Sequence, residues 1–157
     1  MKIIFPTEEF EQRCREQQII GETFLIEAFN FWLHDNPDLR TPFPMYIQEP
    51  LVQNTFQRLM HWAFLQDASQ TDEDEISQIF QAVITEEAAK LVQTDDERLT
   101  ILYPEFPRIG DKTTVAERGT YTVCRRYLQD RNGQRFLKVY LMNDVTKGLL
   151  DTEYEVF

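Results

Sequence analysis

The sequence predicts an α+β fold, in which a bundle of three to four helices comes first and a three- to four-stranded antiparallel sheet packs on it. Two observations predict this order. Residues 7–93 carry apolar side chains at the three- and four-residue spacing of amphipathic helices, whereas residues 97–157 mostly show the two-residue alternation of strands. Because about 60 residues of sheet are marginal alone, we expect one face to pack on the helices and residues 1–157 to form a single domain.

The first helical pattern covers residues 10–31. Thr7 is placed to cap its start, because a threonine oxygen accepts a hydrogen bond from a free N–H of the first turn. Gly21 leaves two alternatives open: one helix that passes through it, at a cost of about 1 kcal/mol relative to alanine, or two helices that meet there. Residues 24–33 are apolar on more than one face and are expected to be buried on several sides. Asn36-Pro37 ends the pattern.

Two further helical patterns follow a proline-containing extended segment at residues 41–45. Pro50 fits the first position of a helix that continues to about Gln66, because its missing N–H needs no partner there. The acidic run 72–75 then begins the clearest amphipathic helix. We expect Thr71 to cap it, and the helix dipole favours the negative charges at its start.

The pattern changes to that of strands after residues 94–96. Residues 98–103 are predicted to form a short strand, and loops are expected around residues 110–112 and 117–119. The tail, residues 149–157, alternates apolar and acidic side chains, as expected of a half-buried strand with one acidic face. The acidic residues of this tail are Asp151, Glu153 and Glu155.

The hairpin at residues 120–142 is the most specific local feature, because Asn132-Gly133 favours the positive φ angles of a two-residue turn. Such a turn pairs Gln129 with Phe136, Tyr127 with Lys138 and Arg125 with Tyr140. The alternative is a type I turn over residues 130–133 with a bulge at Gly133. That register places Arg126 opposite Lys138, a destabilising pair of like charges, so the two-residue turn is favoured.

Charge is distributed unevenly along this acidic chain, whose net charge is −11. Residues 1–95 hold 6 Lys/Arg against 17 Asp/Glu, whereas residues 96–157 hold 10 of each. Within the second part, residues 112–147 have 8 basic and 3 acidic residues. The acidic half repels a phosphate backbone, so nucleic acid is not an expected partner.

No catalytic, metal or cofactor motif is present in the sequence, and we expect no catalytic residue, no metal and no cofactor. Cys14 and Cys124 are expected to be buried free thiols. His34 stands at a predicted helix end, where a protonated imidazole favours the dipole. Apolar runs are shorter than the ~18–20 residues of a membrane span, and residues 1–5 are too short for a signal peptide, so a cytoplasmic location is expected.

The favoured hairpin register points to a candidate binding surface. It places alternating basic and aromatic residues on the face away from the core: Arg125, Tyr127, Lys138 and Tyr140. Such a face suits recognition of a macromolecule. The alternative interpretation is that its basic residues pair with the acidic C-terminal strand across the ladder.

Two functions compete. The first is a non-catalytic macromolecule-binding protein of the adaptor, inhibitor or immunity type, whose partner is another protein and which is a monomer or a weak homodimer paired through residues 149–157. The second is a ligand-binding or enzymatic domain with an aromatic pocket between helices and sheet. Its candidate lining residues are Trp32, Tyr46, His61 and Trp62, although aromatic residues of this kind are more often simply part of a core.

Overall fold

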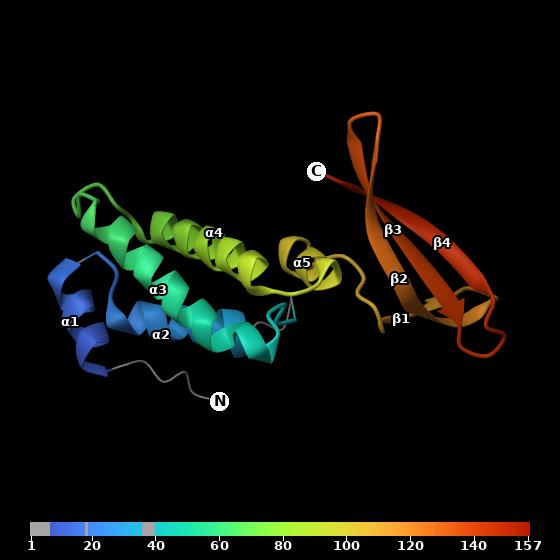
Figure 1. The fold of residues 1–157 in the computed structure, drawn as a ribbon, viewed down its shortest axis with the longest axis horizontal. Coiled ribbons are helices and arrows are strands. Elements are labelled where there is room, and N and C mark those ends of the chain that lie inside the picture. The colour runs from blue at the N-terminus through green and yellow to red at the C-terminus, as the bar shows by residue number, and fades with distance from the viewer. Residues whose placement is uncertain (1–6, 18, 36–39) are drawn as a thin grey trace. The chain divides into compact units, whose positions relative to one another are not determined.

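The computed structural model describes residues 7–17, 19–35 and 40–157, and it confirms the α+β order of helices followed by an antiparallel sheet (Figure 1). The chain divides into two compact units, one ending at Pro104 and the other spanning Glu105–Phe157. We call them the helical unit and the sheet unit. Packing of the sheet on the helices, and a single domain, remain predictions.

The helical unit consists of short N-terminal helices and a long helical hairpin. Its elements are α1 (Thr7–Gln17), α2 (Glu22–Asn30), the π-helical turn η1 (Phe31–Asp35), the 3-10 turn η2 (Met45–Ile47), α3 (Gln48–Phe64), α4 (Glu73–Leu91) and α5 (Asp95–Leu102). Helix α1 begins at Thr7, but the side chain of Thr7 lies outside the described part of the structure, so the cap stays a prediction. The predicted helix end at Asn36-Pro37 also lies outside the described residues.

Two helices, and not one, account for the first helical pattern. Gln17, 7% exposed, ends α1 with its own side chain: its Oε1 accepts the N–H groups of Ile19 and Ile20, both at 2.8 Å. Gly21 then stands in extended conformation at the cap position of α2. No atom lies within 4 Å of the place its Cβ would take, so close packing does not explain the glycine.

The structure corrects two predicted helix starts. The cap of α4 is Asp72, not Thr71, because its Oδ1 accepts the backbone N–H of Glu75 at 2.8 Å. Helix α3 begins at Gln48, so Pro50 is its third residue and not its first. The proline is still tolerated, because the first-turn N–H groups of a helix have no intrahelical partner.

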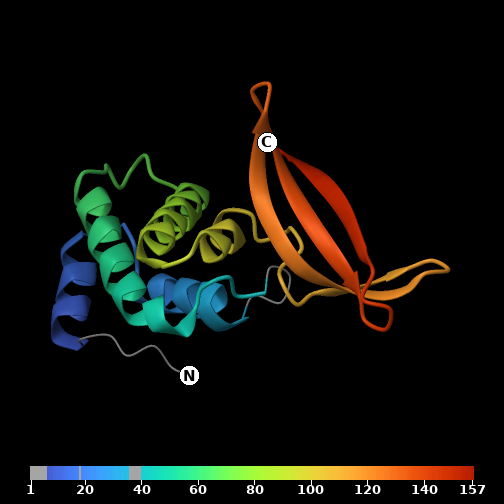
Figure 2. The same cartoon turned by 45° about the vertical axis from the view of Figure 1, so that its right-hand side comes forward.

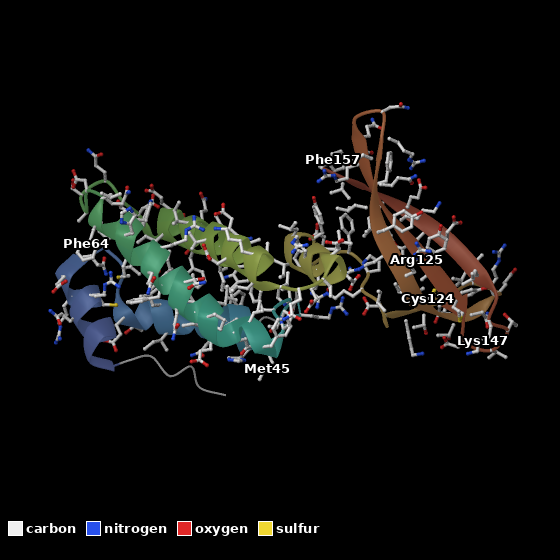
Figure 3. All side chains as sticks on the ribbon, in the orientation of Figure 1. Met45, Phe64, Cys124, Arg125, Lys147 and Phe157 are labelled. Carbon is white, nitrogen blue, oxygen red and sulfur yellow. The ribbon has the colours of Figure 1, made fainter. Side chains whose placement is uncertain are left out.

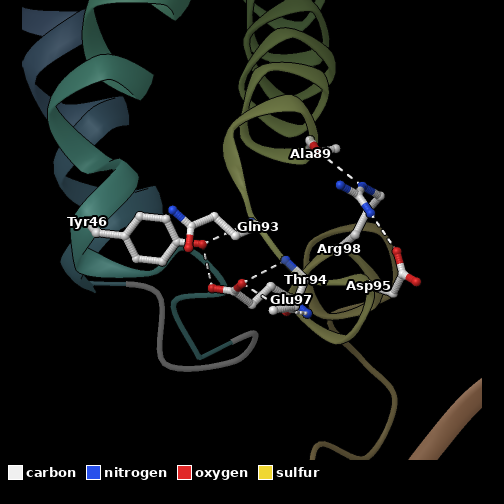
Figure 4. Close-up of polar contacts among 7 residues, drawn as sticks. All are labelled: Tyr46, Ala89, Gln93, Thr94, Asp95, Glu97 and Arg98. Atoms are coloured by element: carbon white, nitrogen blue, oxygen red, sulfur yellow. Dashed lines mark hydrogen bonds and ion pairs between the residues drawn. The ribbon is translucent and has the colours of Figure 1, made fainter.

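The strand predicted at residues 98–103 is wrong, because most of this segment lies in helix α5. Thr94 and Glu97 form a capping box in which the Thr94 Oγ1 accepts the Glu97 N–H and the Glu97 Oε1 accepts the Thr94 N–H, each at 3.1 Å. Figure 4 shows these reciprocal bonds at the start of the helix. A Thr-x-x-Glu sequence is a known helix start, and here it outweighs the strand-like residues that follow.

The helical core is built around α2, α3 and α4. Phe29 and Phe80, both essentially buried, meet edge to face with ring centroids 5.0 Å apart. Leu25 and Leu33 of the segment predicted to be buried on several sides are indeed buried, but Phe31 is 45% exposed. Burial of residues 24–33 is therefore confined to one side, in contrast to the prediction. Helices α3 and α4 lie side by side in both views (Figures 1 and 2).

The sheet unit is a four-stranded antiparallel meander of order β1-β2-β3-β4 that curls along its length (Figure 2). The strands are β1 (Lys112–Val115), β2 (Gly119–Arg131), β3 (Gln134–Asn143) and β4 (Leu149–Val156). Strand β4 confirms the predicted tail strand. Strand β1 is an addition to the prediction, which placed Lys112 in a loop; β-branched residues are favoured in strands and form most of β1.

The hairpin register is the one that the sequence favours. Asn132 and Gly133 both have positive φ, 51° and 80°, as a type I′ turn requires. Arg125 pairs with Tyr140, and Tyr127 pairs with Lys138. The type I alternative is excluded, because it would pair Arg126 with Lys138, whereas Lys138 pairs with Tyr127.

A β-bulge interrupts this register near the middle of β2. Val123 pairs with Leu141 and Arg125 pairs with Tyr140, which leaves Cys124 as an extra residue. Cys124 is consequently exposed, so the prediction that both thiols are buried holds for Cys14 but is wrong for Cys124.

The register set by the turn pairs Arg126 with Val139 and so places Arg126 on the buried face of the sheet, where Leu137 and Val139 are 1% and 0% exposed. The Arg126 guanidinium donates to the carbonyl of Pro107 at 2.9 Å. Phe106 packs its ring against Tyr154 of the same face, with centroids 5.5 Å apart. The segment that precedes β1 thus covers part of this face.

Candidate functional site

Strands β2 and β3 bring the four predicted surface residues together on the face of the sheet opposite Leu137 and Val139. Arg125 is exposed (Figure 3), and Tyr127, Lys138 and Tyr140 are half-buried. The two-residue turn fixes this arrangement, because side chains of paired residues project from the same face of a sheet. We call this surface, formed by Arg125, Tyr127, Lys138 and Tyr140, the outward face.

Arg125 lies over both tyrosines of the outward face. Its Cζ is 5.3 Å from the centroid of the Tyr127 ring and 5.9 Å from that of the Tyr140 ring. The two rings are nearly parallel, with an interplanar angle of 30° and centroids 6.2 Å apart. A hydroxyl–hydroxyl contact with Tyr127, at 3.5 Å, raises the pKa of Tyr140. Aromatic contacts of this kind hold a guanidinium in place without neutralising its charge.

Lys138, in contrast, forms ion pairs with carboxylates of the neighbouring strand, β4. Its Nζ lies 2.8 Å from Asp151 Oδ2 and 3.1 Å from Glu153 Oε1. These contacts raise the pKa of Lys138, and the hydrogen bond from Lys138 lowers the pKa of Asp151. Glu153 has its pKa lowered first by Arg131 and then by Lys138. For Lys138 the pairing with the acidic strand is therefore confirmed.

A second ionic network lies on the same side of the sheet, near the β3–β4 turn. Thr122 donates its hydroxyl to Asp144 Oδ1 at 2.6 Å, and the Lys112 ammonium lies 2.9 Å from Asp144 Oδ2. Both interactions lower the pKa of Asp144, the Thr122 bond most. The charge of Lys112 is thus also balanced locally.

Arg125 differs from these cations. Within the part of the chain that the structure describes, it takes part in cation–π contacts and in none of the ion pairs. On the side of the sheet that carries the outward face, β2 therefore presents a cation, Arg125, that no described carboxylate balances, whereas β4 presents carboxylates. It is polarised along the order of the strands.

The predicted pocket residues have separate structural roles. Trp32 and Trp62 are half-buried against the helical core, whereas His61 is exposed on α3. The core cluster itself contains Phe29 and Phe43. The aromatic groups around α2 and α3 thus contribute to packing, which was the alternative interpretation of this set.

Tyr46, half exposed, holds the connection between α4 and α5. Its hydroxyl donates to Glu97 Oε2 at 2.7 Å and accepts the N–H of Gln93 at 3.1 Å (Figure 4). The bond from Tyr46 is the largest cause that lowers the pKa of Glu97. On the other side of α5, Arg98 donates to the carbonyl of Ala89 at 3.2 Å. The sequence analysis missed this network, although the Thr-x-x-Glu pattern signals part of it.

The described residues also bear on nucleophilic chemistry, on metal binding and on a membrane span. Burial raises the pKa of Cys14 to about 11, so its thiol is protonated at neutral pH and is a poor nucleophile. No group of three or more His, Cys, Asp or Glu residues in the described part could hold a metal ion. The helices described in residues 7–102 include none that combines the length and apolar character needed to cross a membrane.

Comparisons of the chain with protein-family models, with curated proteins and with solved structures give no significant match.

Proposed function

We propose that this protein acts by binding another protein without catalysis, and that the outward face of its sheet forms the contact. The observation that carries the proposal is the exposed guanidinium of Arg125, held over the rings of Tyr127 and Tyr140 and balanced by no described carboxylate. A role as an adaptor, an inhibitor or an immunity-type protein fits such a contact. The expected cytoplasmic location belongs to this proposal as well.

Residue type supports this assignment. Tyrosine and arginine are the residues, with tryptophan, that most often dominate the energy of protein interfaces. The two tyrosines of the outward face are ordered by the sheet and by each other, so binding costs little side-chain entropy. Arg125 has a planar fork of donors that matches a carboxylate through two parallel hydrogen bonds.

Charge narrows the class of partner. Residues 1–95 hold 17 Asp/Glu against 6 Lys/Arg, and this half of the chain repels polyphosphate. A carboxylate displayed on a folded partner experiences mainly the local field of Arg125, because charges beyond about 8 Å are largely screened at physiological salt. The proposed partner is therefore a protein with an exposed Asp or Glu.

Affinity capture from the source cells, with the tagged full-length chain as bait, tests this function. We expect the wild type to retain a partner at low salt, and Arg125→Ala and Tyr127→Ala to retain at least tenfold less, as for a hot spot of about 2 kcal/mol. Arg135→Ala is the matched control, because it removes a partly exposed arginine of the same sheet that pairs with Asp130. Equal capture by Arg125→Ala and wild type, or recovery of chaperones alone, would count against the proposal.

A further inference from the structure

The second feature of the sheet unit that suggests recognition is the free edge of β4. In an antiparallel pair, residues that exchange backbone hydrogen bonds alternate with residues whose N–H and C=O point away. A two-residue turn makes the flanking pair, Arg131 and Gln134, a hydrogen-bonded one. The even-numbered residues of β3 therefore point their backbone groups toward β2, and the odd-numbered residues point theirs toward β4.

Two backbone hydrogen bonds beyond the hairpin confirm this alternation. The N–H of Asn143 donates to the carbonyl of Gly148, at the start of the β4 side, at 2.8 Å. The N–H of Asp144 donates to Thr120, on the β2 side, at 3.0 Å.

The register then assigns the backbone groups of β4. Leu150, Thr152, Tyr154 and Val156 lie opposite odd-numbered residues of β3 and bond to that strand. The residues between them direct their N–H and C=O away from the sheet: Asp151, Glu153 and Glu155. Strand β4 is last in the strand order, so these groups have no partner strand among the described residues. We call the row of backbone groups at Asp151, Glu153 and Glu155 the β4 edge.

We propose that the β4 edge binds an added β-strand of a partner protein, and that this strand carries basic residues at alternate positions. Strand addition is a common mode of peptide recognition, in which backbone hydrogen bonds supply affinity and alternate side chains supply specificity. The inference rests on the proposed function only in that the partner is a protein.

Charge complementarity identifies the occupant. Side chains directly opposite each other on adjacent strands have Cβ atoms about 4.5–5.5 Å apart. The three residues of the β4 edge are exposed and present carboxylates toward the side of the outward face. Asp151 and Glu153 share Lys138, and Glu153 also pairs with Arg131, whereas Glu155 takes part in none of the ion pairs in the described part of the chain. Lysine or arginine opposite these residues would balance the remaining charge.

The side chains on the other face of β4 indicate which residues should stand between the basic residues of the added strand. There the strand shows half-buried Leu150, Thr152, Tyr154 and Val156. Apolar or β-branched residues pair well with such a surface. The matching strand thus alternates basic with apolar or β-branched side chains.

A second copy of this chain is a poor occupant of the same edge. When two β4 edges pair antiparallel, residues that point outward on one copy lie opposite residues that point outward on the other. Each register with an extended overlap then places carboxylates opposite carboxylates, which destabilises the pair. The acidic residues thus protect the edge from self-pairing while they favour a basic strand.

A synthetic peptide of eight residues, with lysine alternating with valine and threonine, provides the probe. With the full-length protein at low salt, we expect this peptide to bind and to slow hydrogen exchange at the amides of Asp151, Glu153 and Glu155. A peptide of the same composition but scrambled order is the control, and it should bind at least tenfold more weakly. Equal binding of the two peptides, or protection confined to other segments, would show charge attraction alone and overturn the proposal.

Two variants separate backbone pairing from charge. Glu155→Pro removes an outward N–H but spares the bonds between β3 and β4, so it should abolish amide protection. Glu155→Gln removes only the charge, and we expect it to weaken binding about two- to fivefold. Glu117→Gln, in the β1–β2 turn, removes one carboxylate elsewhere in the unit and should leave binding unchanged. Undiminished binding by a folded Glu155→Pro variant would contradict strand addition.

The proposal for the β4 edge and the proposal for the outward face can be contradicted independently of each other. Arg125→Ala should leave peptide binding intact, because Arg125 lies on β2, two strands from β4. If Arg125→Ala abolishes partner capture but the peptide does not bind, only the edge proposal is lost. If the peptide binds as expected but Arg125→Ala captures normally, only the outward face is lost.

Discussion

At the scale of single residues, the decisive contrast lies between two cations on neighbouring strands. Lys138 is held between Asp151 and Glu153 and links β3 to β4, whereas Arg125 rests on two aromatic rings and pairs with no described carboxylate. Sequence alone places both on one face but does not separate them. The distinction depends on which residue lies next to the acidic strand, and the order of the strands decides that.

Replacement of Lys138 with methionine tests this assignment. The variant keeps much of the apolar stem but removes the ammonium that lowers the pKa of Asp151. We therefore expect the pKa of Asp151 to rise toward its ordinary value, measured by NMR titration of its carboxyl carbon. Lys147→Met serves as control, since Lys147 has its hydrogen bond with the Asp144 carbonyl and should leave Asp151 unchanged. An unshifted Asp151 in Lys138→Met would show that the ion pair is not formed in solution.

At the scale of elements, α5 shows how a local capping pattern outweighs strand propensity. Residues 98–103 have the composition of a strand, yet the reciprocal bonds of Thr94 and Glu97 begin a helix directly before them. Tyr46 and Arg98 add contacts from η2 and to α4. The contact of Tyr46 with Glu97 spans 51 positions of the sequence and that of Arg98 with Ala89 spans nine, and neither follows a local sequence pattern.

Thr94→Ala removes the N-terminal cap of α5 and should lower the free energy of unfolding by about 1 kcal/mol. Urea unfolding followed by circular dichroism measures the change. Ser77→Ala, at an exposed position inside α4, is the control and should stay within about 0.5 kcal/mol of wild type. If both variants are equally stable, the capping box contributes nothing to the fold.

The β2–β3 hairpin was the most predictable element, because one dipeptide, Asn132-Gly133, fixes the turn and the turn fixes the register. The bulge at Cys124 was not predictable, since no glycine or proline marks it. It reverses the orientation of the residues before it, so Cys124 becomes exposed and Val123 becomes buried. The candidate surface lies entirely on the turn side of the bulge, which is why its four residues could be named from the sequence.

At the scale of the whole molecule, most of the negative charge belongs to the helical unit, whereas several charges of the sheet unit form ion pairs. Residues 1–95 account for the full net charge of −11. In the sheet, Lys138 and Lys112 each meet at least one carboxylate. The chain thus combines a broadly acidic unit with a sheet surface whose charge is polarised from β2 to β4.

Acid should destabilise this protein. The pKa values of Glu97, Asp144, Asp151 and Glu153 are lower in the folded state than their ordinary values. Such groups contribute stability that is present above the unfolded pKa, near 4, and is lost as pH falls through the folded pKa. We expect the urea midpoint to stay nearly constant from pH 7 to 5 and to fall steeply from pH 4.5 to 3. A midpoint that rises or stays level below pH 4 would contradict these assignments.

Site-specific photocrosslinking tests the central claim, protein recognition by the outward face, most directly. A benzophenone amino acid replaces Tyr127 in the full-length chain, expressed in the source cells, and replaces exposed Gln78 on α4 as control. The account predicts one specific protein crosslinked at position 127 and absent at position 78, with the yield reduced when Arg125→Ala is added. The same products at both positions, or no product at position 127, would contradict it.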